Sequence, residues 1–458
     1  MLTEKDPRLA GRVAFQYPNF VSYTIARFFI VVALEMQSVA VGWQVYEITR
    51  RPIDLGYVGL AQFLPGFVLF LFAGHAADIL DRRKLLMWVY VGYASCSALL
   101  LLINKMSHDA ASASGPRTVH LIYVVLVWLG IVRAFSFPVS RAILPHLVPT
   151  EHFANAVAWN ASSFQIATIA GPAIGGLAYA LFHGPGPVYL MTFAVAAASV
   201  SLTFRIHAIG ASEPLSTNSA QEKIEVAEHG PNAGGGPLAC RSGQVRATRF
   251  SVRNVLAGFH FIWEKKLILG SISLDMFAVL LGGAVALLPI YAKTILHTGP
   301  WGLGFLRAAP GVGAALMAIV VAHWPIRRRA GVTMLAAVAG FGVCTIVFGL
   351  STNLYLSLVV LTVLGASDMV SVIIRATLVQ IATPDAMRGR VNAVDMLFIG
   401  VSNELGEFES GITAQWLGTV PAVVIGGIGT LVVIGLWAWM FPELRRADEL
   451  TVAEIAEK

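Results

Sequence analysis

Apolar runs of about 20 residues alternate along the chain with short segments rich in charged residues, glycine or proline. A helix needs about 20 apolar residues to cross the hydrocarbon core of a bilayer. The pattern therefore predicts twelve membrane-spanning helices, at residues 20–47, 55–77, 84–104, 119–143, 153–182, 187–207, 266–294, 302–323, 331–350, 354–378, 391–417 and 421–441. Barrel strands alternate apolar and polar residues over about ten positions, so runs of this length exclude a barrel.

Composition supports the same class of protein. The mean hydropathy is +0.71, and only 13% of residues are charged, against about a quarter in soluble domains. The net charge of +6 does not indicate nucleic acid, because the basic residues fall in the predicted loops. Cys96, Cys240 and Cys344 have no paired spacing, so we expect no disulfide, no metal site and no cofactor.

The basic loops also predict an orientation. Lys and Arg are retained on the cytoplasmic side of a membrane. Clusters occur at Arg82-Arg83-Lys84, Arg327-Arg328-Arg329 and Arg445-Arg446. The connections near 183–186, 351–353 and 418–420 contain no Lys or Arg, and the pair Arg50-Arg51 in the first outer loop is an exception to the pattern. We therefore expect both termini in the cytoplasm.

A polar segment divides the chain into two halves. Residues 208–250 include a glycine- and proline-rich stretch that is typical of a flexible linker. The predicted organisation is a six-helix bundle over 1–207, a cytoplasmic linker over 208–250, an amphipathic helix with a second six-helix bundle over 251–441, and a cytoplasmic tail over 442–458.

The two halves repeat each other. A shift of 245 residues places Gly59, Pro65, Gly66, Arg82 and Arg83 on Gly304, Pro310, Gly311, Arg327 and Arg328. A shift of 234 places Arg141-Ala142 on Arg375-Ala376. Two parallel repeats of six spans predict a substrate site near the membrane midplane, between the halves.

The loop from Gly74 to Lys84 carries a family resemblance. It resembles the loop after the second helix of major facilitator superfamily transporters, Gly-x-Leu-Ala-Asp-Arg-x-Gly-Arg-Arg, and matches it at Gly74, Ala77, Asp78, Arg82 and Arg83. Positions 76, 79 and 81 depart from that pattern. The resemblance implies a gating loop in which the Asp78 carboxylate accepts from amides near 389–391 and closes the cytoplasmic side. A simple charge anchor is the alternative.

Span five carries a second resemblance. Residues 167–176 resemble the antiporter motif of proton-driven exporters in this superfamily, Gly-x-x-x-Gly-Pro-x-x-Gly-Gly. Pro172 removes a backbone donor, and Gly171, Gly175 and Gly176 allow close approach of a neighbouring helix. We expect a hinge here, with ordinary small-residue packing as the alternative. The chain as a whole resembles the bacterial branch that includes the enterobactin exporter, which implies an all-α fold of two pseudo-symmetric bundles working as a monomer.

Ionisable residues within the spans are the main functional candidates. Glu35, Asp368, Glu404 and Glu407 are predicted to lie inside the membrane with Arg133. Glu404 and Glu407 are three residues apart and share a helix face. Two close carboxylates in a low dielectric cannot both ionise cheaply, so we expect one to hold a coupling proton near neutral pH. Alternatively, these acids only form ion pairs with Arg133, Arg307 or Lys293.

Several polar residues are candidates for a substrate cavity. Trp43, at the end of a span, is predicted to anchor the chain at the membrane interface, with a place in the cavity lining as the alternative. The cavity candidates are Gln37, Gln62, Asn160, Gln165 and Arg307.

The sequence thus predicts a proton-coupled antiporter in the bacterial inner membrane that exports a small organic molecule by alternating access. An importer, a lysophospholipid flippase and a non-transporting membrane sensor are the alternatives. No nucleophile–base or metal-ligand spacing favours an enzyme. No phosphate-binding loop occurs either, so ATP is not the predicted energy source.

Overall fold

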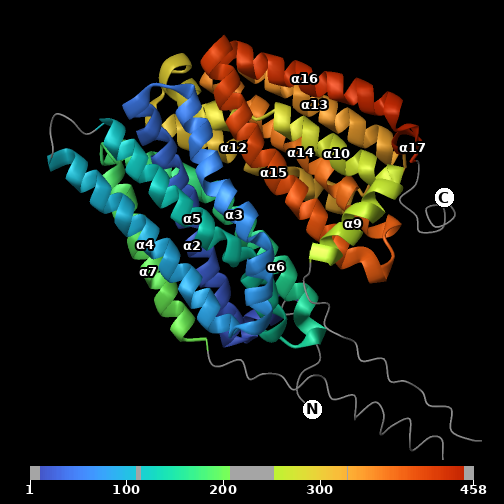
Figure 1. Ribbon diagram of the computed structural model, residues 1–458, viewed down its shortest axis with the longest axis horizontal. Helices are drawn as coiled ribbons and strands as arrows, with labels where there is room; N and C mark the ends of the chain where they lie inside the picture. Colours follow the sequence, from blue (N-terminus) through green and yellow to red (C-terminus); the bar gives the residue numbers. More distant parts are fainter. Residues whose placement is uncertain (1–10, 110–114, 207–251, 327, 448–458) are drawn as a thin grey trace, which may run out of the picture.

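A computed structural model describes residues 11–109, 115–206, 252–326 and 328–447. The predicted linker over 208–250 and most of the predicted tail lie outside the described residues. Long helices form two bundles that lie side by side, one from each half of the chain (Figure 1).

The first bundle opens with the short helix η1 (Val13–Gln16) and contains six long helices. Their bounds are α2 (Pro18–Thr49), α3 (Pro52–Ile79), α4 (Arg82–Asp109), α5 (Gly115–Ile143), α6 (Phe153–Leu181) and α7 (Pro185–Phe204). Two short turns, η2 (Leu144–His146) and η3 (Thr150–His152), join α5 to α6.

The second bundle follows the same order after helix α9 (Val252–Glu264). Its elements are α10 (Lys266–Leu281), η4 (Ala284–Leu287), α11 (Leu288–Ile290), η5 (Tyr291–Ile295), α12 (Gly299–His323), α13 (Ala330–Leu350), α14 (Leu354–Ala382), α15 (Asp385–Leu417), α16 (Thr419–Met440) and α17 (Pro442–Arg445).

The predicted twelve-span architecture is confirmed. Within the described residues, eleven segments are long and apolar enough to cross a membrane. Helix α15 is not among them, because its acidic side chains lower its hydropathy. It has 33 residues, about 50 Å at 1.5 Å per residue, and it packs against α3 and α10. It is therefore the twelfth spanning helix.

Helix boundaries follow local chemistry. Pro18, Pro52 and Pro185 stand in the first turns of α2, α3 and α7, where a missing N–H costs nothing. Asn353 Oδ1 accepts from the amides of Tyr355 at 2.9 Å and Leu356 at 3.2 Å and so caps α14.

The seventh span is interrupted rather than continuous. Helix α10 ends at Leu281, and a 3-10 turn, a short α segment and a π-helical turn complete the crossing. A Cβ on Gly283 would lie 2.7 Å from the carbonyl oxygen of Gly406, so α15 approaches the break closely. Pro289, which cannot donate a backbone hydrogen bond, follows one turn later.

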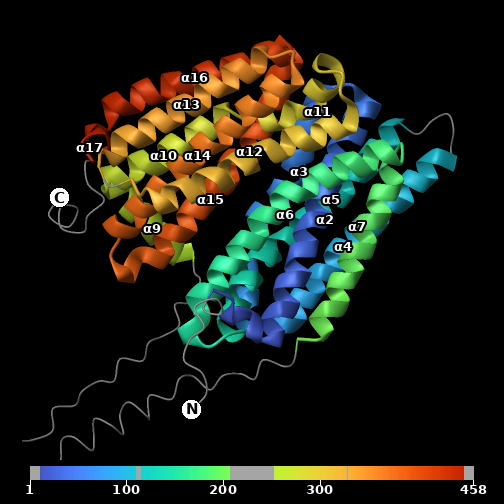
Figure 2. The same cartoon turned by 180° about the vertical axis from the view of Figure 1, so that it is seen from behind.

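The two bundles meet at one end and splay apart toward the other (Figures 1 and 2). We call the end with the α2–α3 connection the closed end, and the end with the α3–α4 connection the open end. Near the closed end, a Cβ on Gly56 of α3 would lie 3.1 Å from the Cα of Phe408 on α15. Near the same end, a Cβ on Gly176 of α6 would lie 2.8 Å from the Cα of Gly304 on α12.

Helix α9 confirms the short helix predicted before the seventh span. Ile262 is 2% exposed and packs with Ile268 and Val391, whereas Phe259 is half-exposed and stacks on Phe398 at 6.2 Å between ring centroids. One face of α9 therefore docks onto α10 and α15 at the open end.

Candidate functional site

A cavity of about 570 Å³ lies between the two halves and has the volume of a site for a drug-sized molecule. The first bundle contributes walls from α2, α3, α4, α5 and α6, and the second contributes from η4, α11, α12 and α15. Six ionisable side chains of opposite sign line it, namely Arg27, Glu35, Arg133, Arg307, Glu404 and Glu407. The predicted site between the halves thus coincides with a real cavity.

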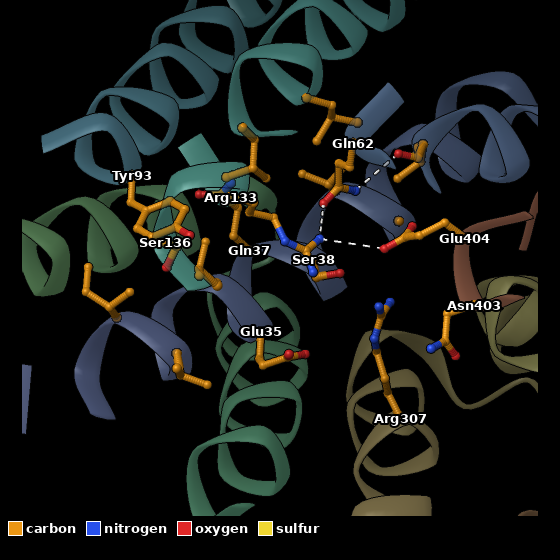
Figure 3. A pocket seen from close by; sticks show the side chains of 18 of the residues that line it. Glu35, Gln37, Ser38, Gln62, Tyr93, Arg133, Ser136, Arg307, Asn403 and Glu404 are labelled. Carbon is orange, nitrogen blue, oxygen red and sulfur yellow. Dashed lines mark hydrogen bonds and ion pairs between the residues drawn. The ribbon is translucent and has the colours of Figure 1, made fainter. Parts of the chain in front are cut away.

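Arg133 connects the halves at the centre of this cavity. Its Nη1 lies 3.9 Å from Oε1 of Glu404 on α15 and 3.2 Å from Oε1 of Gln62 on α3. Figure 3 shows the guanidinium between these two groups. The Arg133 side chain is 50% exposed to the cavity and that of Glu404 is 22% exposed. The charge is therefore accommodated by a cavity and one carboxylate, as an intramembrane guanidinium requires.

The two carboxylates of α15 converge on one glycine of α3. A Cβ on Gly59 would lie 2.7 Å from Oε2 of Glu407 and 3.5 Å from Oε2 of Glu404. Glycine at this position leaves the room that the Glu407 carboxylate occupies. Both acids lie on one face of α15, as their spacing predicted, and both face the first bundle across the interface.

Glu35 and Arg307 complete the charged ring from opposite halves. Arg307 extends from α12 toward the cavity, and Glu35 faces it from α2 (Figure 3). The charge of Arg307 acts on both Glu404 and Glu407, and that of Glu35 acts on Glu407. Three carboxylates thus share two nearby guanidiniums, so adding a proton to one carboxylate changes which ion pairs form.

Gln37 lines the same cavity from α2. Its Oε1 accepts from the Ser97 hydroxyl at 2.7 Å, while its buried Nε2 has no partner among the described residues. An unpaired buried donor beside a cavity is costly unless water or a ligand accepts from it.

The other amides predicted for the cavity have structural contacts. Asn160 Oδ1 accepts from Arg27 Nη1 at 3.0 Å. Gln165 Nε2 donates to the carbonyl of Gly311 at 3.1 Å, which joins α6 to α12 across the two halves. Neither residue lines the cavity.

Asp368 lies in a separate cluster within the second bundle. There Arg375 of α14, which is 4% exposed, pairs with Asp275 of α10 at 3.5 Å and with Asp395 of α15. Asp368 interacts electrostatically with Asp275 and Arg375, but it does not line the cavity. Asp368 was among the intramembrane acids predicted from the sequence, whereas Asp395 was not singled out, although an acid inside an apolar run was a visible signal.

The residues of the predicted hinge face two different helices. Cβ atoms on Gly171 and Gly175 would meet α2 at Glu35 Cβ and Met36 Cα, within the first bundle. One on Gly176 would meet α12, in the other bundle. Pro172 stands inside an unbroken α6. The motif therefore provides close packing both within and between the halves.

The predicted gating loop is described in part. The side chains of Gly74 and Asp78 lie outside the described residues. Arg82 contacts the His146 ring, and Arg83 Nη2 donates to the carbonyl of Phe204 at 2.9 Å. The carboxylate of Asp81 accepts from the amides of Arg83 and Lys84 and caps α4. These contacts fix the loop to η2 and α7 of the same bundle.

Trp43 does not lie at the interface as predicted. It is 4% exposed and forms part of a contact that joins the halves at the closed end. Lys293 Nζ of η5 lies 2.7 Å from Oε1 of Glu47 on α2 and 5.1 Å from the centroid of the Trp43 ring. The Tyr179 hydroxyl donates to the same carboxylate at 3.3 Å. The ring is buried in the hydrophobic core, where it packs against Tyr179 and contacts the Lys293 cation.

No group of three or more His, Cys, Asp and Glu side chains with the geometry of a metal site occurs in the described part of the chain.

The family model described as "Major Facilitator Superfamily" matches residues 22–407. The enterobactin exporter EntS of Escherichia coli O1:K1 / APEC is 25% identical over 433 residues, which cover 94% of this chain and 93% of the exporter. The same exporter of Escherichia fergusonii has the same identity and coverage.

Solved structures of low sequence identity share the fold. A bacterial homologue of the iron transporter ferroportin in an inward-facing state gives a TM-score of 0.66 at 13% identity, covering 93% of this chain and 98% of that one. A D-xylose–proton symporter gives 0.65 at 12% identity, with the same coverage.

Proposed function

The chain belongs to the Major Facilitator Superfamily, and from this premise we propose that it is a proton-coupled antiporter that exports a small organic molecule across the bacterial inner membrane. One observation carries the proposal. Arg133 of one half pairs with Glu404 of the other, inside a cavity that also contains Glu35 and Glu407. An ion pair that joins the two halves links their relative position to the protonation of its carboxylate.

The arginine-rich loops support a cytoplasmic position for the open end, because Lys and Arg are retained on that side of a membrane. In this state the cavity receives its substrate from the cytoplasmic side. Rocking of the two bundles about the midplane then exposes the same site to the opposite side. The similarity to an exporter over 94% of the chain supports the direction of transport.

Coupling follows from competition between the proton and the substrate. In the state open to the cytoplasm, Glu404 and Glu407 are ionised, interact with Arg133 and Arg307, and the cavity binds substrate. After the site has opened to the opposite side, a proton that enters from outside neutralises one carboxylate, weakens its ion pair and lowers the affinity for the substrate, which leaves. Release of the proton to the cytoplasm restores the ion pair and the substrate-binding state. In this cycle, a bound proton and a bound substrate exclude each other.

The test is proton flux in proteoliposomes. Purified protein, reconstituted with an internal pH dye, is exposed to a library of siderophores, organic acids, dyes and lipids. We expect some solute to cause proton movement that depends on the protein, and Glu407→Gln to abolish the coupling. Glu409→Gln is the matched control, because Glu409 is on the same helix but binds the Thr413 hydroxyl at 2.6 Å away from the cavity.

Proton flux that persists in Glu407→Gln, Glu404→Gln and Glu35→Gln would show that these carboxylates do not carry the proton. Solute movement without any pH change would remove proton coupling and leave a uniporter.

A further inference from the structure

The part of the cavity nearest the open end contains a cationic group outside the proposed coupling ring, which consists of Glu35, Arg133, Arg307, Glu404 and Glu407. Arg27 of α2 lines the cavity. Its Nη1 donates to the Tyr23 hydroxyl at 3.2 Å, which donates at 3.2 Å to the carbonyl of Ser140, the residue before Arg141 at the end of α5. Neither guanidinium forms an ion pair with a carboxylate among the described residues. Two neighbouring cations without an acid repel each other in a low dielectric, so an anion placed between them would be stabilised.

In the second bundle, the corresponding arginine forms ion pairs with carboxylates of the same bundle. Arg375 is the repeat partner of Arg141, on the fourth long helix of its half. It is balanced by carboxylates from the first and fifth helices, Asp275 and Asp395. In the first bundle, the first and fifth helices supply Arg27 and the neutral Asn160 instead. The arginine is thus common to both halves, but in the first half it has no carboxylate partner among the described residues, and a second cation and an amide lie nearby.

Arg27 is held in place with part of its guanidinium unused. Its Nη1 donates to the Tyr23 hydroxyl at 3.2 Å and to Asn160 Oδ1 at 3.0 Å. Its Nε and Nη2 have no hydrogen bond to a described residue. A guanidinium offers five donors in a planar fork that suits a carboxylate. Fixing one arm with neutral groups orients the fork without neutralising it.

A tyrosine hydroxyl next to Arg27 also lacks a partner. Tyr90 of α4 is 2% exposed and lines the cavity, and its hydroxyl has no hydrogen bond among the described residues. Its electrostatic neighbours are Tyr23 and Arg27. A buried hydroxyl without an acceptor is unfavourable, and an anion bound at Arg27 would accept from it.

Each guanidinium is also covered by an aromatic ring. Arg27 lies 5.7 Å from the centroid of Phe164, and Arg141 lies 4.5 Å from that of Phe137. Both rings line the cavity and are close to half-exposed. An anionic group in this place therefore has flat apolar surfaces beside it, which an aromatic body fits better than an aliphatic one.

From these contacts we propose that Arg27, Arg141 and Tyr90 form an anion subsite at the open end of the cavity, and that the exported substrate is an organic acid with an aromatic body. This rests on the proposed transport function. The carboxylate or another anionic group binds between the guanidiniums and the Tyr90 hydroxyl, and the ring lies against Phe137 and Phe164. The coupling ring at Arg133 is left free for the proton cycle.

The test is ligand binding by calorimetry with the full-length protein in detergent. The probes are benzoate, its neutral analogue benzyl alcohol, and the benzylammonium cation. Wild-type protein is expected to bind benzoate at least tenfold more tightly than either analogue. Arg27→Gln and Arg141→Gln should each remove most of that preference, and Arg27→Lys should retain part of it. Tyr90→Phe should weaken benzoate binding about threefold to tenfold without affecting benzyl alcohol.

Two controls separate binding at this subsite from a general effect of positive charge on the protein surface. Arg50→Gln changes an exposed arginine at the closed end and should leave the preference intact. Arg141 is also exposed, so its substitution tests the subsite even if Arg27→Gln fails to fold. Equal affinity for the three probes, or an equal loss in Arg50→Gln, would overturn the proposal. So would phosphatidylglycerol displacing all bound benzoate at low mole fraction, since the cations would then hold a lipid headgroup.

The transport assay keeps the two proposals distinguishable. If a neutral or cationic solute drives proton flux that depends on Glu407, while benzoate does not bind, only the subsite fails. If benzoate binds as described but no solute moves protons, the antiport proposal fails and the anion site stands.

Discussion

The glycine contact between α6 and α12 sets a sharp test of the rocking mechanism. A Cβ on Gly304 would lie 2.5 Å from the carbonyl oxygen of Pro172 and 3.0 Å from the Cα of Gly176. These atoms are backbone atoms of the other bundle and cannot move aside without moving α6. We therefore expect Gly304→Ala to separate the bundles at the closed end.

The magnitude follows from the type of contact. Forcing one extra methyl group into a packed interface typically costs about 1–3 kcal/mol. Because this contact joins the two halves and is not part of either core, each bundle stays folded and the cost falls on the equilibrium between states. An energy of this size shifts such an equilibrium about 5-fold to 150-fold, toward the conformation in which the bundles are apart at the end that is closed in this structure.

The assay is electron–electron distance measurement between spin labels at the closed end. Labels on Phe182→Cys and Thr352→Cys, both exposed, report on one loop from each half in a background in which Cys96, Cys240 and Cys344 are replaced. Gly304→Ala should move the distance distribution to longer values while the thermal midpoint changes little.

Gly171 on α6 and Gly435 on α16 serve as controls. Gly171→Ala introduces a Cβ 3.0 Å from the Val32 carbonyl within the first bundle, so it should lower the thermal midpoint without changing the distance. Gly435→Ala has nothing within 4 Å and should change neither. An unchanged distance distribution in Gly304→Ala would refute the view that this seam must part during transport.

Three further substitutions have expected outcomes. Lys293→Met removes the partner of Glu47 at the closed end. Since the pair is part-exposed, with the Glu47 side chain at 46%, its loss costs about 1 kcal/mol, and the populations in the spin-label distance distribution should change a few-fold. An unchanged distribution would show that the pair does not hold the closed end together. Arg375→Met leaves two buried carboxylates without their cation, at a cost of about 3–5 kcal/mol, so thermal unfolding in detergent should occur well below the wild-type midpoint; an unchanged midpoint would contradict this role. Arg133→Ala should insert into membranes at wild-type levels but abolish transport in liposomes, and full activity would reduce Arg133 to a scaffold residue.

The spans and their pairing could be predicted from sequence because the bilayer imposes its length on each of them. Hydropathy alone identifies eleven of the long helices in the described residues, and the repeat of the Gly59 and Gly304 stretches placed α3 and α12 in corresponding positions. Both glycines now stand where the halves touch. The same physics also placed Glu404 and Glu407 on one face, since helical periodicity is a local property.

Contacts between distant helices were not predictable in the same way. Lys293 was visible as a possible partner for an acid, but Glu47 was not singled out, because no local pattern connects α2 to η5. Trp43 was assigned to the interface from its place at a span end, whereas its ring is buried and contacts Lys293 from the other half. Arg27 carried no motif, and its exposure to the cavity follows only from the packing of α2.

Helix α15 is a spanning helix that length and hydropathy do not identify, although they identify its neighbours. Its acids lower its hydropathy below that of the eleven apolar spans, and a helix with such a sequence would be unstable if it faced lipid. It is stable here because Asp395 pairs with a buried arginine of its own bundle, while Glu404 faces Arg133 across the cavity. The first contact is internal to one half, but the second joins two halves that separate in the proposed transport cycle. Only the second contact can depend on which end is open. The acids that lower the hydropathy of α15 therefore have two roles: Asp395 stabilises its own bundle, and Glu404 and Glu407 are the residues proposed to couple motion to a proton.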